Sequence, residues 1–203
     1  LSDTGFVTEF ELSSPLGRRR IALGLAGEHN VMNALAAAAA AHAAGAGIEA
    51  IVDGLTSMRA VTGRLEMRPA HAGARMIDDS YNANPASLRA GLRALSSVPG
   101  RHWLVLGEMR ELGTESARLH AEMGEFARQT GVARLLAVGD DAHHAVEAFG
   151  TGATWFASVD DMIAALRAEL GPDVTVLVKG SRSNRLERVS AALASAAVAG
   201  AGH

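Results

Sequence analysis

The sequence predicts an α/β protein in which a Rossmann-like, three-layer domain with a mainly parallel sheet follows a β-hairpin and a pair of helices. From about residue 64 onward, short apolar runs alternate with helical patterns of roughly 10–15 residues, which is typical of βαβ units. Before that point, two alternating β-like runs precede two helical stretches. The pattern therefore changes near Gly63 and predicts two domains, residues 1–63 and 64–203.

Composition excludes several classes of protein. The 203 residues carry a formal net charge of −3, so no nucleic-acid or anionic-membrane partner is expected. Cysteine is absent, which excludes disulfides, thiolate metal sites and cysteine nucleophiles. The longest wholly apolar run, residues 34–41, is far shorter than the roughly 20 residues that span a bilayer. The chain starts Leu1-Ser2-Asp3-Thr4, and we expect it to be the middle of a longer chain.

The first domain is expected to open with β structure over residues 5–25, either a hairpin or a sheet edge. Its two alternating runs flank the turn signal Pro15-Leu16-Gly17. An alanine-rich helix should then start within residues 27–30 and continue to about Ala44. A second helix, with one apolar stripe, is expected over residues 48–58.

The second domain is expected to alternate strands with helices. The strands are predicted at residues 65–68, 74–78, 102–106, 133–138, 153–156 and 174–178, and the helices at 85–96, 115–130, 142–149, 160–170 and 186–198. Asn84 and Pro85 favour a helix start, since Asn is a common N-cap and Pro a common first helical residue. Thr114 is the expected N-cap of the helix that follows it.

Polar loops follow four of the predicted strands, at residues 79–84, 107–113, 139–141 and 179–185. In a parallel sheet these loops lie at the carboxyl edge, where ligands bind. Lys179 and Arg182 suit an anion, although a solvated basic turn fits the same residues. The adjacent carboxylates Asp78 and Asp79 fit a functional role or a charge near a helix start.

Several catalytic signatures are absent. Lys179 is the only lysine and follows Val178, so the sequence holds no G-x-x-x-x-G-K-[ST] phosphate loop. It also lacks a G-x-S-x-G nucleophile elbow. The histidines lack metal-ligand spacing, and we expect His120 to be structural. His143 and His144 are adjacent and should point different ways at the surface, so no metal site is predicted.

Asn30 and Asn33 are three residues apart, which places them on one face of the first helical turn. An Asn amide can pair bidentately with the N6 and N7 edge of adenine. Spacing alone favours a simpler interpretation, in which Asn30 caps the helix and Asn33 packs locally.

Five motifs, in order along nearly the whole chain, resemble those of the Mur ligases. Residues 27–37 (GEHNVMNALAA) resemble the family's G-x-H-N-x-x-N-A-x-A-A stretch, and residues 61–66 (VTGRLE) its interdomain segment. Residues 78–87 (DDSYNANPAS), 107–113 (GEMRELG) and 178–182 (VKGSR) look like the branch that adds D-Ala-D-Ala. The resemblance implies that residues 1–63 are the C-terminal part of a central ATP-binding domain and that the remainder is the C-terminal ligase domain.

The resemblance also implies a reaction. It would be ATP-dependent addition of D-Ala-D-Ala to UDP-N-acetylmuramoyl-tripeptide through an acyl phosphate, in peptidoglycan precursor synthesis. The cofactors would be ATP and Mg²⁺, with the Mg²⁺ ligands mostly in parts of such a ligase that this sequence lacks. By resemblance we expect a cytoplasmic monomer, and this fragment alone should be inactive.

Ten side chains receive roles from the resemblance. The expected ATP contacts are Asn30, Asn33, Arg64 and Asp79, with the two asparagines at adenine and Asp79 at the ribose hydroxyls. The expected catalytic residues are Tyr81, Asn82 and Lys179. The expected substrate contacts are Asn84, Ser181 and Arg182, of which Arg182 would bind the terminal carboxylate of the dipeptide.

Two alternatives remain at this point. One is a related amide ligase, such as a folylpolyglutamate synthase or the Mur ligase that adds the third peptide residue, although Ser181-Arg182 fits the dipeptide adder better. The other is a non-catalytic, receiver-like α/β module, suggested by Asp140, Asp141 and Lys179 at strand ends. The loop at Gly107 does not supply the phosphoacceptor Asp that a receiver needs.

Overall fold

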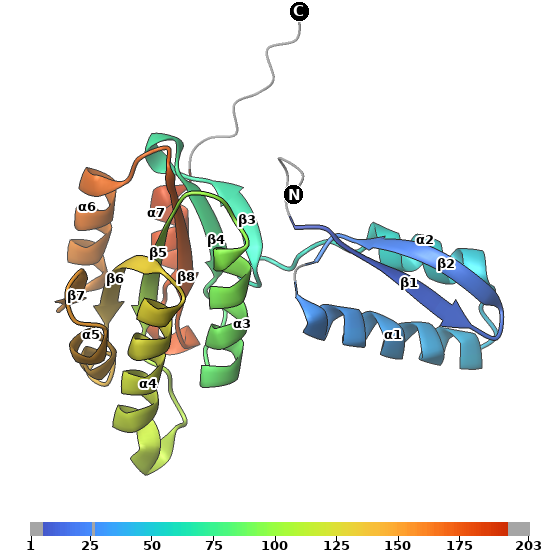
Figure 1. The fold of residues 1–203 in the computed structure, drawn as a ribbon, viewed down its shortest axis with the longest axis horizontal. Coiled ribbons are helices and arrows are strands. Elements are labelled where there is room, and N and C mark those ends of the chain that lie inside the picture. Colours follow the sequence, from blue (N-terminus) through green and yellow to red (C-terminus); the bar gives the residue numbers. More distant parts are fainter. Residues whose placement is uncertain (1–5, 26, 195–203) are drawn as a thin grey trace, which may run out of the picture. The chain divides into compact units, whose positions relative to one another are not determined.

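The computed structural model describes residues 6–25 and 27–194. The chain forms two compact units, one ending at Val61 and the other starting at Thr62 (Figure 1). The division lies two residues before the boundary expected from the sequence pattern.

The first unit consists of a β-hairpin and two helices. Strands β1 (Thr8–Ser14) and β2 (Gly17–Leu23) pair antiparallel, and helices α1 (Glu28–Ala43) and α2 (Ile48–Ser57) follow, as the sequence predicts. The core residues are mostly branched aliphatics and alanines: Leu12, Ile21, Leu23, Ala34, Ala38, Ile51 and Leu55. The apolar stripe expected on the second helix is thus the face that the unit buries.

The second unit, within the described residues, is built on one sheet with the strand order β3-β4-β8-β5-β6-β7 (Figure 1). The strands are β3 (Glu66–Pro69), β4 (Arg75–Asp79), β5 (Arg101–Gly107), β6 (Val132–Val138), β7 (Ala153–Phe156) and β8 (Val174–Lys179). Pairing is parallel except between β3 and β4, so the mainly parallel sheet is confirmed. Every residue of β8 is buried, as expected for a central strand covered on both faces.

Helices cover both faces of this sheet and complete the three-layer architecture (Figure 1). Helices α3 (Pro85–Ser96), α4 (Ser116–Gln129) and α5 (His143–Phe149) lie together on one face. Helices α6 (Val159–Glu169) and α7 (Glu187–Leu193) pack on the other. The core under α6 and α7 contains Met76, Trp103, Val176, Leu166 and Val189.

The start of α3 agrees with the sequence signal in detail. Asn84 is the N-cap, and its side chain accepts a hydrogen bond of 2.8 Å from the backbone N–H of Ser87. The Ser87 hydroxyl accepts one of 3.1 Å from the Asn84 backbone N–H in return, which completes a capping box. Pro85 occupies the first helical turn, where its missing N–H is harmless.

Two local expectations in the second unit are wrong. Thr114 does not cap α4, because residues 113–115 form a short 3₁₀ turn that runs directly into the helix, with Glu115 at the N-cap position. His143 and His144 do not point apart, because their ring centroids lie 3.9 Å from each other at the start of α5. The expected last helix ends at Leu193 in the structure, and residues 195–198 of that prediction lie outside the described residues.

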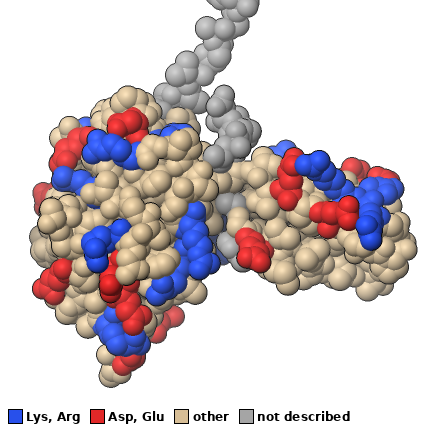
Figure 2. All heavy atoms as spheres, in the orientation of Figure 1, with Lys and Arg blue, Asp and Glu red and all other residues tan. Residues whose placement is uncertain are grey.

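Acidic and basic side chains are mixed on the visible surface of each unit (Figure 2). On the hairpin, Arg19 pairs with Glu49 of α2 at 2.7 Å and Arg20 with Glu9 at 2.5 Å, both in exposed positions where such pairs add little stability. Among the described helices, none combines the length and apolar character that crossing a membrane requires.

Candidate functional site

The candidate site lies at the carboxyl edge of the second unit's sheet. Strand β8 runs between β4 and β5, so Lys179 at its end is in register with Asp79 on one side and Leu106 on the other. The loops that follow these three strands therefore meet, as the parallel sheet predicts. They bring together the segments around residues 80–84, 108–110 and 180–184.

A buried ion pair joins the first and last of these strand ends. The ammonium of Lys179 donates to Asp79 Oδ2 at 2.5 Å and to the backbone carbonyl of Asn82 at 2.9 Å. The Lys179 side chain is only 2% exposed and that of Asp79 12%. Asp79 Oδ1 accepts a further hydrogen bond of 3.2 Å from the backbone N–H of Leu65. The pair fixes the direction in which the loop after β4 leaves the sheet.

Burial raises the pKa of the Asp79 carboxyl above its ordinary value, because desolvation disfavours the charged form. The nearby ammonium of Lys179 and the N–H of Leu65 act in the opposite direction and offset part of the rise. A raised pKa in the folded state means that this carboxyl favours folding when it is protonated. Its contribution is fully present below the ordinary pKa of Asp and is lost as the pH rises through the folded-state value.

We expect a titration of the chain to show this shift directly. The side-chain ¹³C resonance of Asp79, followed from pH 3 to pH 8, should titrate with a midpoint above about 3.9, the ordinary value for Asp. A midpoint at or below that ordinary value would show that the Lys179 ammonium outweighs desolvation.

Two exposed arginines lie close to the ring of Tyr81. The guanidinium carbon of Arg64 lies 4.6 Å from the ring centroid and that of Arg182 lies 5.2 Å from it. Tyr81 is 45% exposed, and its backbone N–H donates to the carbonyl of Gly63 at 3.0 Å. Gly63 has a φ of 76°, and a Cβ there would lie 3.3 Å from the Tyr81 nitrogen. This close approach brings the segment with Arg64 against the loop after β4.

Two asparagines of the same loop have structural contacts. Asn82 accepts a hydrogen bond of 2.8 Å from the N–H of Ala83, and its own carbonyl is bound by Lys179. The side-chain oxygen of Asn84 is engaged in the capping box of α3. Each side-chain amide nitrogen can still donate to a ligand, so the expected contacts with substrate stay predictions.

Ser181 connects the loop after β8 to the loop after β5. Its hydroxyl accepts a hydrogen bond of 2.8 Å from the N–H of Arg110, and its backbone N–H donates to the Glu108 carbonyl at 3.2 Å. The amide of Asn184 donates to the same carbonyl at 2.8 Å. Ser181 is buried, whereas Arg182 beside it is exposed. Arg182 thus projects from a loop whose backbone is held on both sides.

The sequence did not predict roles for Glu108 and Asn184. The Glu108 carboxylate is buried, lies 2.5 Å from Arg110 Nη1, and accepts a longer hydrogen bond of 3.4 Å from the N–H of Asp141. Glu108 therefore joins the loops after β5, β6 and β8. The sequence feature that could have pointed to Glu108 is its position directly after Gly107, where the strand ends.

His120 is structural, as expected. Its Nε2 accepts a hydrogen bond of 2.9 Å from the N–H of Met109, and its Nδ1 donates to the Ser116 carbonyl at 2.8 Å. These two contacts fix the tautomer of a fully buried ring, because a backbone N–H can only donate and a carbonyl can only accept. The ring thus supports the loop after β5 through its bond to Met109.

In the first unit, Asn30 and Asn33 lie on the first turns of α1. The Asn33 amide nitrogen is 3.5 Å from the Asn30 side-chain oxygen, so the two share a face as predicted. The simpler interpretation of Asn30 as the helix cap is wrong, because the N-cap is Gly27 and the helix starts at Glu28. Asn33 is exposed and Asn30 partly so.

The exposed polar groups of the second unit suit an organic anion better than a triphosphate. The only lysine is buried against Asp79, and the sequence has no phosphate-binding glycine loop. Arg64 and Arg182 are exposed cations, and a guanidinium matches the geometry of a carboxylate or a single phosphate. The carboxylates Asp79 and Glu108 already have basic partners, so neither is a vacant Mg²⁺ ligand.

A parallel sheet with converging polar loops at its carboxyl edge defines the class of α/β ligand-binding domains. The family model described as "Mur ligase, glutamate ligase domain" matches residues 63–182, and the chain belongs to this family.

Two relatives with curated names share one description. The UDP-N-acetylmuramoyl-tripeptide–D-alanyl-D-alanine ligase of Escherichia coli (strain K12) is 42% identical over 192 residues, covering 94% of this chain and 42% of the relative. Its counterpart in Mycobacterium tuberculosis (strain CDC 1551) is 38% identical, covering 91% and 41%. The crystal structure of MurF from Acinetobacter baumannii superposes with a TM-score of 0.83 at 33% identity, covering 94% and 44%. The chain thus spans about two fifths of the length of these relatives.

Proposed function

We propose that this chain is part of an ATP-dependent amide ligase that adds D-Ala-D-Ala to UDP-N-acetylmuramoyl-tripeptide. The observation that carries the proposal is the pair of exposed guanidinium groups, Arg64 and Arg182, close to the ring of Tyr81 at the carboxyl edge of the sheet. Both arginines lie within the segment that matches the ligase family. The relatives named above carry this activity in their descriptions, which supports the choice of substrates.

Arg182 is the proposed contact for the terminal carboxylate of the dipeptide. Its side chain is exposed and carries a permanent charge, and its loop is fixed through Ser181. Tyr81 and Asn82 would then lie beside the incoming amine, with Asn84 offering its amide nitrogen. Ser181 and Lys179 act by positioning, because both are buried and bonded to neighbouring loops.

The proposed nucleotide contacts fall in two sets. In the first unit, Asn30 and Asn33 present amide groups from one helix face, which suits adenine. In the second unit, Asp79 would accept hydrogen bonds from ribose hydroxyls, since each of its oxygens keeps a second lone pair, and Arg64 would contact the nucleotide beside it.

Positioning and charge neutralisation are the contributions expected of this chain. ATP, with Mg²⁺, would supply the phosphoryl group that activates the tripeptide carboxylate. The residues here would hold the adenosine, orient the dipeptide amine towards the activated carbonyl and neutralise the dipeptide carboxylate. Because the sequence lacks a phosphate loop, residues 1–203 alone should not ligate. We further propose that the enzyme is a cytoplasmic monomer.

The test is Arg182→Ala in a ligase that joins this chain to the remaining part found in its relatives. We expect the KM for D-Ala-D-Ala to rise about 10–100-fold, since a hydrogen bond to a charged group is worth about 1.5–3 kcal/mol. The KM for ATP should change little. Arg93→Ala, which removes an exposed arginine on α3, is the matched control and should leave both values unaltered.

Three outcomes would contradict the proposal. An unchanged dipeptide KM for Arg182→Ala would remove Arg182 from the carboxylate site. Preference for a single amino acid over D-Ala-D-Ala would favour a different amide ligase. Ligation by residues 1–203 alone would show that the chain holds phosphate chemistry that its sequence does not reveal.

A further inference from the structure

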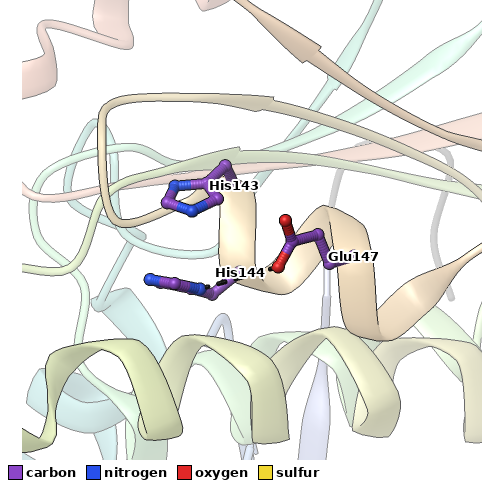
Figure 3. A group of neighbouring side chains, drawn as sticks. All are labelled: His143, His144 and Glu147. Atoms are coloured by element: carbon purple, nitrogen blue, oxygen red, sulfur yellow. Dashed lines mark ion pairs between the residues drawn. The ribbon is translucent and has the colours of Figure 1, made fainter.

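Three potential metal ligands gather at the start of α5, directly after the loop that follows β6. One ring nitrogen each of His143 and His144 and one carboxylate oxygen of Glu147 all lie within 4.8 Å of one another. The two rings are tilted by 38°, and the carboxylate of Glu147 reaches back towards them from the next helical turn (Figure 3).

The spacing of these atoms is close to that of a bound metal ion. Zn²⁺ binds imidazole nitrogen and carboxylate oxygen at about 2.0–2.2 Å, so ligand atoms in a tetrahedral site are about 3.4 Å apart. His144 Nδ1 and Glu147 Oε2 are already 3.7 Å apart. The largest remaining closure, from 4.8 Å to about 3.4 Å, needs only small rotations of surface side chains, which cost little.

The backbone orients one of the rings. His143 Nδ1 is hydrogen-bonded to the carbonyl of Asp140, and since a carbonyl can only accept, Nδ1 carries the proton. Metal-binding histidines commonly donate their second ring N–H to a backbone carbonyl, which fixes the tautomer and leaves the other nitrogen with its lone pair. His143 therefore has the supporting contact that a ligand requires.

The local charge favours a cation. Between Arg134 and Arg167 the sequence holds no Lys or Arg, while it holds Asp140, Asp141 and Glu147 next to the two histidines. The N-terminal end of α5 carries a partial positive charge that opposes a cation. The negative charge of three carboxylates within eight residues exceeds this partial positive charge of about one half. One of them, Asp141, also accepts a hydrogen bond of 2.5 Å from the Ser116 hydroxyl.

We propose that His143, His144 and Glu147 form a binding site for one Zn²⁺-like divalent ion, separate from the ligase chemistry. Two imidazoles and one carboxylate suit Zn²⁺, Co²⁺ or Ni²⁺, whereas Mg²⁺ prefers oxygen ligands alone. Solvent can reach the cluster, because the side chains of His144 and Glu147 are 31% and 71% exposed. Three protein ligands with an open position match the donor count of an accessible zinc site.

Bound metal would fix the loop after β6. That loop contains Asp140, whose carbonyl orients His143, and Gly139, whose carbonyl accepts a 2.9 Å hydrogen bond from the indole of Trp155. An ion held by α5 would therefore restrain the segment between β6 and α5. Since the unfolded chain lacks this arrangement, the metal should raise the melting temperature of the second unit.

The experiment titrates Zn²⁺ into residues 1–203 by calorimetry in a non-chelating buffer at pH 7.5, with Co²⁺ as a spectroscopic probe. We expect one site that gives visible Co²⁺ absorption of tetrahedral or five-coordinate intensity. The double variant His143→Ala/His144→Ala should lose that absorption, and its Zn²⁺ affinity should fall by at least about tenfold. Glu147→Gln, a surface change that preserves the fold, should weaken binding without abolishing it.

His71→Ala is the matched control, because His71 lies in the same unit but outside the cluster. It should bind Zn²⁺ like the wild type. Equal affinity in the wild type and the double variant, or a Co²⁺ spectrum that persists in the double variant, would overturn the proposal and assign the metal to other histidines. Stabilisation by Mg²⁺ equal to that by Zn²⁺ would overturn the choice of metal.

Discussion

Replacing Lys179 with methionine should lower the free energy of unfolding of the second unit by about 3–5 kcal/mol. Methionine keeps most of the side-chain volume, so the change removes the charge rather than the packing. The Asp79 carboxylate would stay buried without its 2.5 Å ammonium partner, and the Asn82 carbonyl would lose a donor. Removing one member of a buried pair costs more than the pair itself contributes, because an uncompensated charge remains.

Urea unfolding followed by tryptophan fluorescence measures this effect on the correct unit, since Trp103 and Trp155, the only tryptophans, both lie in the second unit. The double variant Asp79→Asn/Lys179→Met carries no buried charge at this position and should recover part of the loss. Equal stabilities of Lys179→Met and the wild type would show that water or a neighbouring group compensates Asp79. Failure of the double variant to recover any stability would assign the effect to packing.

The elements of the fold were largely predictable because their signals are local. The bounds of α3 were correct to the residue, since Asn84 and Pro85 mark its start chemically. The strand at residues 153–156 was correct because it combines Thr, Trp and Phe after a turn that contains Gly150 and Gly152. Strand-helix alternation then led to a parallel sheet, and a parallel sheet places the polar loops at one edge.

The contacts within the candidate site were less predictable, because they join residues distant in sequence. The sequence suggested an anion or solvent as the surroundings of Lys179, and the structure adds Asp79, 100 residues earlier, as its partner. The bonds from Ser181 and Asn184 to Glu108 likewise span more than 70 residues. Which polar groups in an edge loop face the ligand and which hold neighbouring loops depends on strand order, and no local pattern encodes that order.

The direction of side chains at helix ends was also poorly predicted from the sequence. Adjacent residues in a helix interior point about 100° apart, so His143 and His144 were expected to diverge. At the first turn of α5 the Asp140 carbonyl draws the His143 ring back along the loop, and the rings come together. Thr114 has strong N-cap propensity, but the chain there is already in a 3₁₀ turn, so the hydroxyl has no free cap position.

Helices α4 and α5 meet at a glycine, and this contact should be the most sensitive packing position of the second unit. A Cβ added at Gly124 would lie 2.1 Å from the carbonyl oxygen of Ala145, a backbone atom that cannot move without the helix. Gly124→Ala should therefore destabilise the unit by about 1–3 kcal/mol through overpacking, despite the better helix propensity of alanine.

The same substitution at Gly54 should have the opposite effect on stability. Gly54 lies inside α2, and a Cβ there would meet no atom within 4 Å, so Gly54→Ala should stabilise the first unit by about 0.5–1 kcal/mol. Tryptophan fluorescence follows the unit with Gly124, and amide hydrogen exchange of α2 follows the unit with Gly54. Stabilisation of the second unit by Gly124→Ala would mean that α4 and α5 can separate without cost. The close approach of the two helices would then not explain the glycine at this position.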